Sequence, residues 1–168
     1  EQRILDASCG VGRNMRFFLE NDFDITGFDP KERAIAELKE QFPKQSANFS
    51  VDSIETFKDP TGFDYIICNA VLHFARDHHH FNAMLSGLVS VLRLNGTLFI
   101  RMTSDIGMDL LESETGVHSL QDGSTRYCVT RSQINELIED HSLELDGSVK
   151  TVKVEDLRSM TLMVFRKQ

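Results

Sequence analysis

The sequence predicts an α/β protein built on a doubly wound, mostly parallel sheet of seven strands that ends in an antiparallel hairpin. The first observation is an alternation of short apolar runs with segments whose apolar residues recur at helical spacing. The second is the run FDYIIC at 63–68, which is typical of a central strand covered on both faces. The third is that only residues 155–159 separate the last two β runs, which is too short for a crossover and requires a hairpin.

The first half of the chain is predicted to contain four strands and two helices. Asp29 is expected to cap the second helix, because Pro30 fits its first turn and Pro43 marks its exit. Residues 58–62 carry a proline and a glycine and are predicted to form a loop. The strands are the runs at 3–6, 24–29, 48–51 and 63–68, and the helices, each with one apolar face, span 13–21 and 30–42.

The second half is predicted to begin with a long helix and to end in β structure. Asp77 is expected to cap this helix, and Asn95-Gly96 to turn the chain into a strand at 97–102. Thr130 and Gln133 form a capping-box pattern before another helix. Residues 103–125 show no firm periodicity and are predicted to form a long excursion. The final β runs cover 143–154 and 160–165. No repeat or domain-sized linker interrupts the series, so residues 1–168 are expected to form a single domain.

Composition argues against several classes of protein. The 168 residues are 40% hydrophobic and 26% charged, no segment approaches the roughly 20 apolar residues of a membrane span, and no signal peptide is recognisable. Cys9, Cys68 and Cys128 form no CxxC pair, which favours buried, reduced thiols and a cytoplasmic location over disulfides or a zinc site. A net charge of −8 makes nucleic acid an unfavoured partner.

A loop of small residues follows the first strand in the segment LDASCGVGRN, residues 5–14. Gly10 and Gly12 permit a tight turn and the close approach of a ligand, although two glycines can also merely end a strand. A dinucleotide fingerprint would place a third glycine where Met15 stands. The carboxylate of Asp6 would repel a pyrophosphate and suits a cationic ligand with amine and hydroxyl donors.

Ligands of doubly wound sheets lie at the carboxyl ends of the strands, beside the switch in strand order. Four polar residues are expected at that edge: Asp6, Asp29, Asp52 and Asn69.

With this loop and the segments after it, the chain resembles the class I S-adenosylmethionine-dependent methyltransferases, in particular those that act on small molecules. Their first motif reads as an aspartate followed by glycine, cysteine, glycine, any residue and glycine. Further segments match in order and spacing, namely ITGFDP, NFSVDSI, FDYIICNAVLHF and VLRLNGTLFIRM. The resemblance covers residues 3–102 well and the C-terminal third more loosely, and Ser8 stands where the family usually has glycine. It implies a Rossmann-like methyltransferase fold, S-adenosylmethionine as cofactor, and methyl transfer to a small molecule.

The resemblance also implies roles for individual residues. Asp29 would grip the ribose hydroxyls, unless it is only a helix cap, and Asp52 would meet the adenine amino group, unless it is a solvated loop acid. Asp6 would bond loop amides or the amino group of the ligand. The expected cofactor-binding residues are Asp6, Ser8, Cys9, Gly10, Gly12, Asn14, Asp29, Pro30, Asp52, Ser53, Ile54 and Asn69.

Methyl transfer from a sulfonium needs no nucleophilic side chain, and a general base matters only if the acceptor must lose a proton. His73, just after the fourth strand, is the candidate for a catalytic base or acceptor-orienting residue, with a packing histidine as the alternative. His78, His79 and His80 are consecutive at a helix start, so their side chains diverge and no metal site is predicted.

The methyl acceptor is expected to reach a pocket shaped by residues 69–74 and 103–127. Because the first strand begins at Arg3, the domain is expected to lack an N-terminal lid segment. The acidic balance of the excursion would suit a neutral or amine-bearing acceptor. The alternatives are a non-catalytic S-adenosylmethionine-binding module, a methyltransferase acting on RNA or protein, and a nucleotide-dependent oxidoreductase. The segment Asn69-Ala70-Val71-Leu72 differs from the Asn-Pro-Pro-Tyr that holds a flipped adenine.

Overall fold

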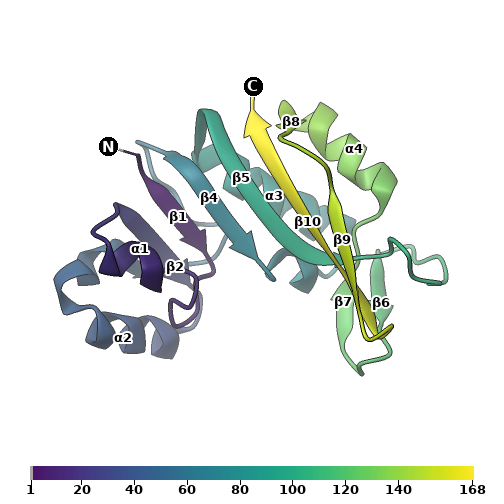
Figure 1. Ribbon diagram of the computed structural model, residues 1–168, viewed down its shortest axis with the longest axis horizontal. Helices are drawn as coiled ribbons and strands as arrows, with labels where there is room; N and C mark the ends of the chain where they lie inside the picture. Colours follow the sequence, from purple (N-terminus) through teal and green to yellow (C-terminus); the bar gives the residue numbers. More distant parts are fainter. Residues whose placement is uncertain (1) are drawn as a thin grey trace.

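One twisted sheet runs through the molecule, with helices on both of its faces (Figure 1). The computed structural model describes residues 2–168. Its strands are β1 (Ile4–Ala7), β2 (Ile25–Asp29), β3 (Phe49–Val51), β4 (Phe63–Asn69), β5 (Leu92–Ser104), β6 (Val117–Ser119), β7 (Thr125–Tyr127), β8 (Leu143–Leu145), β9 (Lys150–Val154) and β10 (Arg158–Lys167). Its helices are α1 (Arg16–Glu20), α2 (Glu32–Gln41), α3 (His78–Val91) and α4 (Arg131–Asp140), with 3₁₀ segments η1 (Pro43–Asn48) and η2 (Leu72–Phe74).

The strand order confirms the predicted fold class. The main sheet runs β3-β2-β1-β4-β5-β10-β8, and β9 also pairs with β10. Strands β1 to β5 pair in parallel, whereas every pair that includes β10 is antiparallel. The order reverses between β1 and β4, and such a reversal opens a crevice at the carboxyl ends of the strands.

The C-terminal part differs in detail from the prediction. The sheet has eight strands instead of seven, because the run at 143–154 bends around Gly147, which has φ +98°. The two pieces, β8 and β9, therefore pair with different parts of β10. The excursion at 103–125 was expected to lack regular structure, but its residues contribute to the two-stranded ribbon of β6 and β7.

Both N-terminal helices begin later than predicted. Gly10 and Gly12 have positive φ, +56° and +78°, and residues 10–15 form consecutive turns, so α1 begins only at Arg16. Helix α2 begins at Glu32 with Lys31 as its N-cap, so Pro30 lies outside its first turn. The prediction that Asp29 caps this helix is wrong, because Asp29 Oδ1 accepts from the backbone N–H of Lys31 at 2.9 Å in the turn before the helix.

The starts of the two later helices are confirmed. Asp77 Oδ1 accepts from the backbone N–H of His80 at 2.7 Å at the start of α3. At the start of α4, Thr130 Oγ1 accepts from the Gln133 backbone N–H at 3.1 Å and Gln133 Oε1 accepts from that of Thr130 at 2.9 Å. None of the helices within residues 2–168 has the length and apolar character that crossing a bilayer requires.

The predicted turn at Asn95-Gly96 lies inside β5 rather than before it. Asn95 has φ +61°, and the pairing of β4 with β5 shifts register between Phe63 and Tyr65. The chain therefore passes from α3 into β5 without a separate loop.

Buried apolar side chains form two clusters, one on each face of the sheet. Alternate residues of β1 divide between them, with Leu5 in the larger cluster and Ile4 in the smaller. The larger cluster contains side chains of α3 and α4, and the smaller contains side chains of α1 and α2. Cys9, Cys68 and Cys128 are buried and free, which confirms the expected role as small buried side chains.

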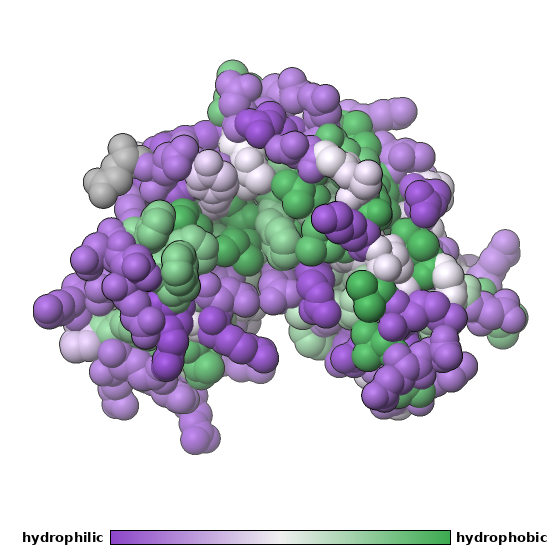
Figure 2. Space-filling view, in the orientation of Figure 1, coloured by the Kyte–Doolittle hydropathy of each residue, from purple (hydrophilic) through white to green (hydrophobic). Residues whose placement is uncertain are grey.

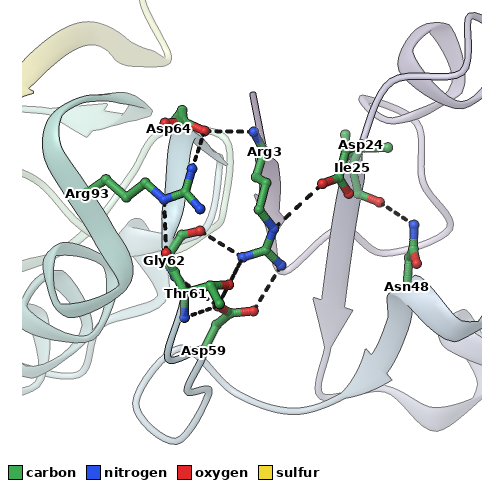
Figure 3. Close-up of polar contacts among 9 residues, drawn as sticks. All are labelled: Arg3, Asp24, Ile25, Asn48, Asp59, Thr61, Gly62, Asp64 and Arg93. Carbon is green, nitrogen blue, oxygen red and sulfur yellow. Dashed lines mark hydrogen bonds and ion pairs between the residues drawn. The ribbon is translucent and has the colours of Figure 1, made fainter. Parts of the chain in front are cut away.

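Arg3 ties the amino end of β1 to the loop before β4 (Figure 3). Its Nη1 and Nη2 donate to the two carboxylate oxygens of Asp59 at 3.0 and 3.1 Å, and Nη1 also donates to the Gly62 carbonyl at 2.8 Å. Asp64 Oδ2 accepts from the Arg3 backbone N–H at 2.8 Å and from Arg93 Nη1 at 2.7 Å. These bonds fix the relative positions of the central strands at the edge opposite the crevice.

One face of β4 is only partly covered, in contrast to the prediction from its continuous apolar run. Tyr65 is 39% exposed, and together with Phe18, Phe23, Ile67 and Phe99 it borders a groove of about 310 Å³. Figure 2 shows apolar surface over the middle of the sheet on this side. The groove reaches the amino ends of the strands at Gln2 and Ile4 and brings together few polar groups, so it is not the candidate ligand site.

Candidate functional site

Two adjoining cavities lie at the carboxyl ends of β1, β2 and β4, where the strand order reverses. Their shared wall consists of Ser8, Asp29, Lys31, Val71 and Phe74. The first, here called the Pro30 cavity, has a volume of about 380 Å³ and is also lined by Pro30, Ser53, Ile54, Glu55, His80 and Met84. The second, the Asn14 cavity, has a volume of about 490 Å³ and is also lined by Cys9, Gly10, Val11, Arg13, Asn14, Asn69, Ala70 and Arg101.

The loop after β1 is held in place by the carboxylate of Asp29 at the end of β2. Asp29 Oδ2 accepts from the Gly10 backbone N–H at 2.9 Å and from Ser8 Oγ at 3.2 Å. Ser8 has φ +60°, in the left-handed region that glycine adopts at the lowest conformational energy. This conformation gives a physical reason why glycine is usual at this position. The serine hydroxyl offsets part of that backbone cost through its bond to Asp29.

The two loop glycines have different surroundings. A Cβ added to Gly10 would meet no atom within 4 Å, and Gly10 lines the Asn14 cavity. A Cβ added to Gly12 would collide with Cδ1 of Leu38 on α2, and Gly12 lines neither cavity. Gly10 therefore leaves room beside the cavity, whereas Gly12 allows the loop to pack on α2.

A chain of polar side chains connects Asn14 and Asn69, which line the Asn14 cavity, to Asp6, which lines neither cavity. Asn14 Nδ2 donates to Asp6 Oδ1 at 3.5 Å, and Asn69 Nδ2 donates to Asn14 Oδ1 at 3.3 Å. Asp6 Oδ2 and Asn69 Oδ1 are buried and accept no hydrogen bond from residues 2–168. Two unpaired acceptors on residues that both bond to Asn14 fit a ligand group that donates several hydrogen bonds, such as an ammonium.

The carboxyl group of Asp6 is 1% exposed, and this burial raises its pKa to about 7. The hydrogen bond from Asn14 opposes this shift, and the nearby charge of Asp29 adds to it. A positive ligand group beside Asp6 would favour its ionised form. Burial likewise raises the pKa of the Cys9 thiol to about 12, so Cys9 is a neutral wall residue.

The other predicted cofactor residues divide between the cavity and its support. Pro30, Ser53 and Ile54 line the Pro30 cavity directly. Asp52 does not; its Oδ1 accepts from the Ser53 backbone N–H at 2.8 Å and from the Thr56 hydroxyl, and so holds the turn that presents Ser53. The adenine contact assigned to Asp52 stays a prediction.

His73 lies behind the cavity wall rather than on it. It is 7% exposed, its Nδ1 is buried without a hydrogen-bond partner among residues 2–168, and it lines neither cavity. Burial, together with the smaller effects of the charges of Arg126, Arg158 and Arg101, lowers its pKa to about 4. Its neighbour Phe74 is 58% exposed and borders both cavities.

Two of the three consecutive histidines, His78 and His80, contact different partners, as their positions at a helix start predict. His78 Nδ1 lies 2.9 Å from Tyr127 Oη and 2.8 Å from Gln133 Nε2, and His80 Nε2 lies 2.8 Å from Glu55 Oε1. Within residues 2–168 no group of three or more His, Cys, Asp and Glu side chains is arranged to hold a metal ion.

Sequence reasoning missed the charged residues of the cavity walls. Arg13, Lys31 and Arg101 line the Asn14 cavity, and Glu55 lines the Pro30 cavity. Arg101 is the penultimate residue of the strand predicted at 97–102. The rule that places ligands at the carboxyl ends of strands therefore gave a signal for it.

Comparison with known proteins agrees with this geometry. Residues 5–98 match the family model described as a methyltransferase domain. The trans-aconitate 2-methyltransferase of Enterobacter sp. (strain 638) is 30% identical over 105 residues, which is 61% of this chain and 40% of that protein. The chain thus spans less than half the length of this relative.

Two solved structures share the fold over 99% of this chain. The 1,6-didemethyltoxoflavin-N1-methyltransferase of Burkholderia thailandensis has a TM-score of 0.75, 20% identity and 71% of its own chain covered. An S-adenosylmethionine-dependent methyltransferase of Methanosarcina mazei has a TM-score of 0.78, 17% identity and 92% covered. The match of the family model over residues 5–98 therefore shows that the chain belongs to the methyltransferase-domain family, and its fold agrees with that of these solved structures.

Proposed function

We propose that the protein transfers the methyl group of S-adenosylmethionine to a small-molecule acceptor. The observation that carries this proposal is the pair of unpaired buried acceptors, Asp6 Oδ2 and Asn69 Oδ1, on two residues that both bond to Asn14. Asn14 and Asn69 line the Asn14 cavity. The α-ammonium of the methionine part supplies the several donors that these atoms lack. A dinucleotide would instead bring a pyrophosphate toward the carboxyl group of Asp6.

The two cavities offer contacts for the rest of the cofactor. Asp29 borders both and would accept from the ribose hydroxyls, as Ser8 and Gly10 already donate to it. Pro30, Ser53 and Ile54 line the Pro30 cavity, which suits the adenine ring. Arg13 at the Asn14 cavity is the cation that we assign to the methionine carboxylate.

When bound, S-adenosylmethionine supplies an electrophilic methyl carbon on a positively charged sulfur. The task of this chain is to hold the acceptor in line with that carbon, because positioning provides most of the acceleration of such a displacement. Val71 and Phe74, the two apolar residues of the shared wall, border both cavities and would shield this region from water. The low pKa of His73 keeps its ring neutral near pH 7 but makes it a weak base.

A small acceptor is supported by the size of the site and by the relatives. The Asn14 cavity, at about 490 Å³, has the volume of a typical small-molecule pocket. Trans-aconitate and 1,6-didemethyltoxoflavin, the compounds for which two similar enzymes are named, are small molecules. The net charge of −8 further disfavours RNA or DNA.

Calorimetry with S-adenosylmethionine and a screen for S-adenosylhomocysteine release test the proposal. The screen should contain small carboxylates, amines, thiols and phenols beside RNA, DNA and protein. We expect cofactor binding and release with a subset of the small molecules only. Release confined to a macromolecule would contradict the small-molecule acceptor, and absence of cofactor binding would contradict the whole proposal.

A further inference from the structure

Two arginines near the cavity wall at Phe74 have no acidic partner. Arg101, near the carboxyl end of β5, lines the Asn14 cavity, and its side chain makes no hydrogen bond or ion pair with residues 2–168. Arg126, on β7, has its Cζ atom 4.8 Å from the centre of the Phe74 ring, and its Nη1 donates to the carbonyl of Thr125. Figure 1 shows the carboxyl end of β5 running toward β6 and β7, which brings these elements together.

Both arginines lie close enough to the segment after β4 for their charges to act on His73. The charges of Arg101, Arg126 and Arg158 all act on His73, which packs edge-on against Phe74 with ring centres 4.6 Å apart. Arg158 Nη1 is paired with Asp122 Oδ2 at 2.7 Å. The positive charges of Arg101 and Arg126 therefore remain uncompensated among the described side chains.

Three acidic residues of the excursion at 103–125 line another cavity and do not pair with Arg101 or Arg126. Asp105, Glu112 and Glu114 line a separate cavity of about 680 Å³ that shares no residue with the Asn14 cavity. The charged side chains on the wall of the Asn14 cavity are three cations, Arg13, Lys31 and Arg101, and one acid, Asp29. The acidic balance of the excursion, which suggested a neutral or amine-bearing acceptor, thus belongs to another part of the surface.

We propose that Arg101 and Arg126 bind a carboxylate of the methyl acceptor, so that the acceptor is a small organic anion. This inference rests on the proposed function, because it identifies the substrate class of the same site. Arginine is suited to the role because its planar guanidinium presents paired donors that match a carboxylate. The two residues bind and orient the acceptor and exchange no proton with it.

The first experiment compares binding of charged and neutral probes to the complex with S-adenosylhomocysteine. The probes are benzoate, succinate and tricarballylate, each beside its amide, and the readout is the shift of arginine side-chain NMR signals. We expect the carboxylates to bind at least about ten-fold more tightly than the amides. Equal binding of the amides, or no carboxylate binding up to about 10 mM, would overturn the inference.

Variants then assign the effect to the two residues. Arg101→Gln and Arg126→Gln should each weaken carboxylate binding by about ten-fold, and Arg101→Lys should retain part of it. Arg33→Gln is the matched control, because Arg33 is exposed on α2 and forms no bond with residues 2–168, and should change nothing. Circular dichroism spectra like that of the wild type would show that each variant folds.

A final comparison separates the acceptor from the cofactor. S-adenosylhomocysteine carries a carboxylate, and 5′-methylthioadenosine lacks it. If Arg101→Gln weakened the first and spared the second, Arg101 would belong to the cofactor and the inference would fail. If the wild type did not bind S-adenosylhomocysteine at all, the proposed function would fail instead.

Discussion

The buried carboxyl group of Asp6 predicts that cofactor affinity depends on pH. In the free protein its pKa is about 7, whereas the ammonium of the cofactor requires the ionised form. At pH 5.5 only about one molecule in thirty carries ionised Asp6, against about half at pH 7.0. We therefore expect the dissociation constant of S-adenosylhomocysteine to be at least about ten-fold higher at pH 5.5 than at pH 7.0.

The same group affects folding with the opposite sign. Because the folded-state pKa lies above the ordinary value of 3.8, the folded protein binds more protons than the unfolded chain between these two values. This contribution to stability is fully present below pH 3.8 and disappears as the pH rises through about 7. Between pH 5.5 and 7.5 it amounts to about 2 kcal/mol in favour of the lower pH, as an upper estimate.

Asp6→Asn isolates both effects, since asparagine cannot ionise. Isothermal titration calorimetry of the wild type and the variant gives the binding part, and urea denaturation at the two pH values gives the folding part. 5′-Methylthioadenosine, which has no ammonium, should bind without the dependence on Asp6. The wild type is compared with the variant at each pH, so that the effects of other ionisable groups cancel. An identical pH dependence in Asp6→Asn would refute the reasoning.

Three further predictions concern other parts of the molecule. Asp29→Ala should weaken S-adenosylhomocysteine binding by about ten-fold or more in calorimetry, because the ribose hydroxyls lose a charged acceptor, and unchanged affinity would contradict the ribose contact. Asp59→Ala should lower the free energy of unfolding in urea by about 1.5–3 kcal/mol by freeing Arg3, and should leave cofactor affinity unchanged, since the network lies at the opposite edge of the sheet. Thr130→Ala should lower the free energy of unfolding by about 1 kcal/mol, because the capping box is lost. Thr130→Ser keeps a hydroxyl and should retain most of the stability of the wild type. Equal stability of the two variants in urea denaturation would argue against the cap.

The order of strands and helices could be predicted because local signals and tertiary contacts agree there. The run 63–68 did become a central strand, and the caps at Asp77 and Thr130 formed as their sequence patterns indicate. The bend at Gly147 was missed. The two parts of the run, β8 and β9, pair with different segments of β10, and the sequence of the run does not show where the first pairing ends and the second begins.

The sequence predicted the positions of candidate residues at strand ends, but only in part those of residues in loops. Asp29 and Asn69 end their strands, so their position followed from the strand order. The direction of His73 is set by the 3₁₀ turn after β4, and no pattern in the sequence determines which of His73 and Phe74 faces the cavity. Arg101 follows the same rule, because it lies near the carboxyl end of β5 and pairs with Asn69 of β4.

The division of the interior into two unequal clusters has a consequence for local unfolding. Cys9 and Met15, which flank and support the cofactor loop, belong to the smaller cluster together with Leu38 of α2. Segments that bury less apolar surface open at lower free energy, so backbone amides of α1 and α2 should exchange with solvent hydrogen sooner than those of β4 and β5. A ligand bound to the loop stabilises only the closed form of this part. Cofactor binding should thus slow hydrogen exchange most on the side of the sheet that carries the smaller cluster.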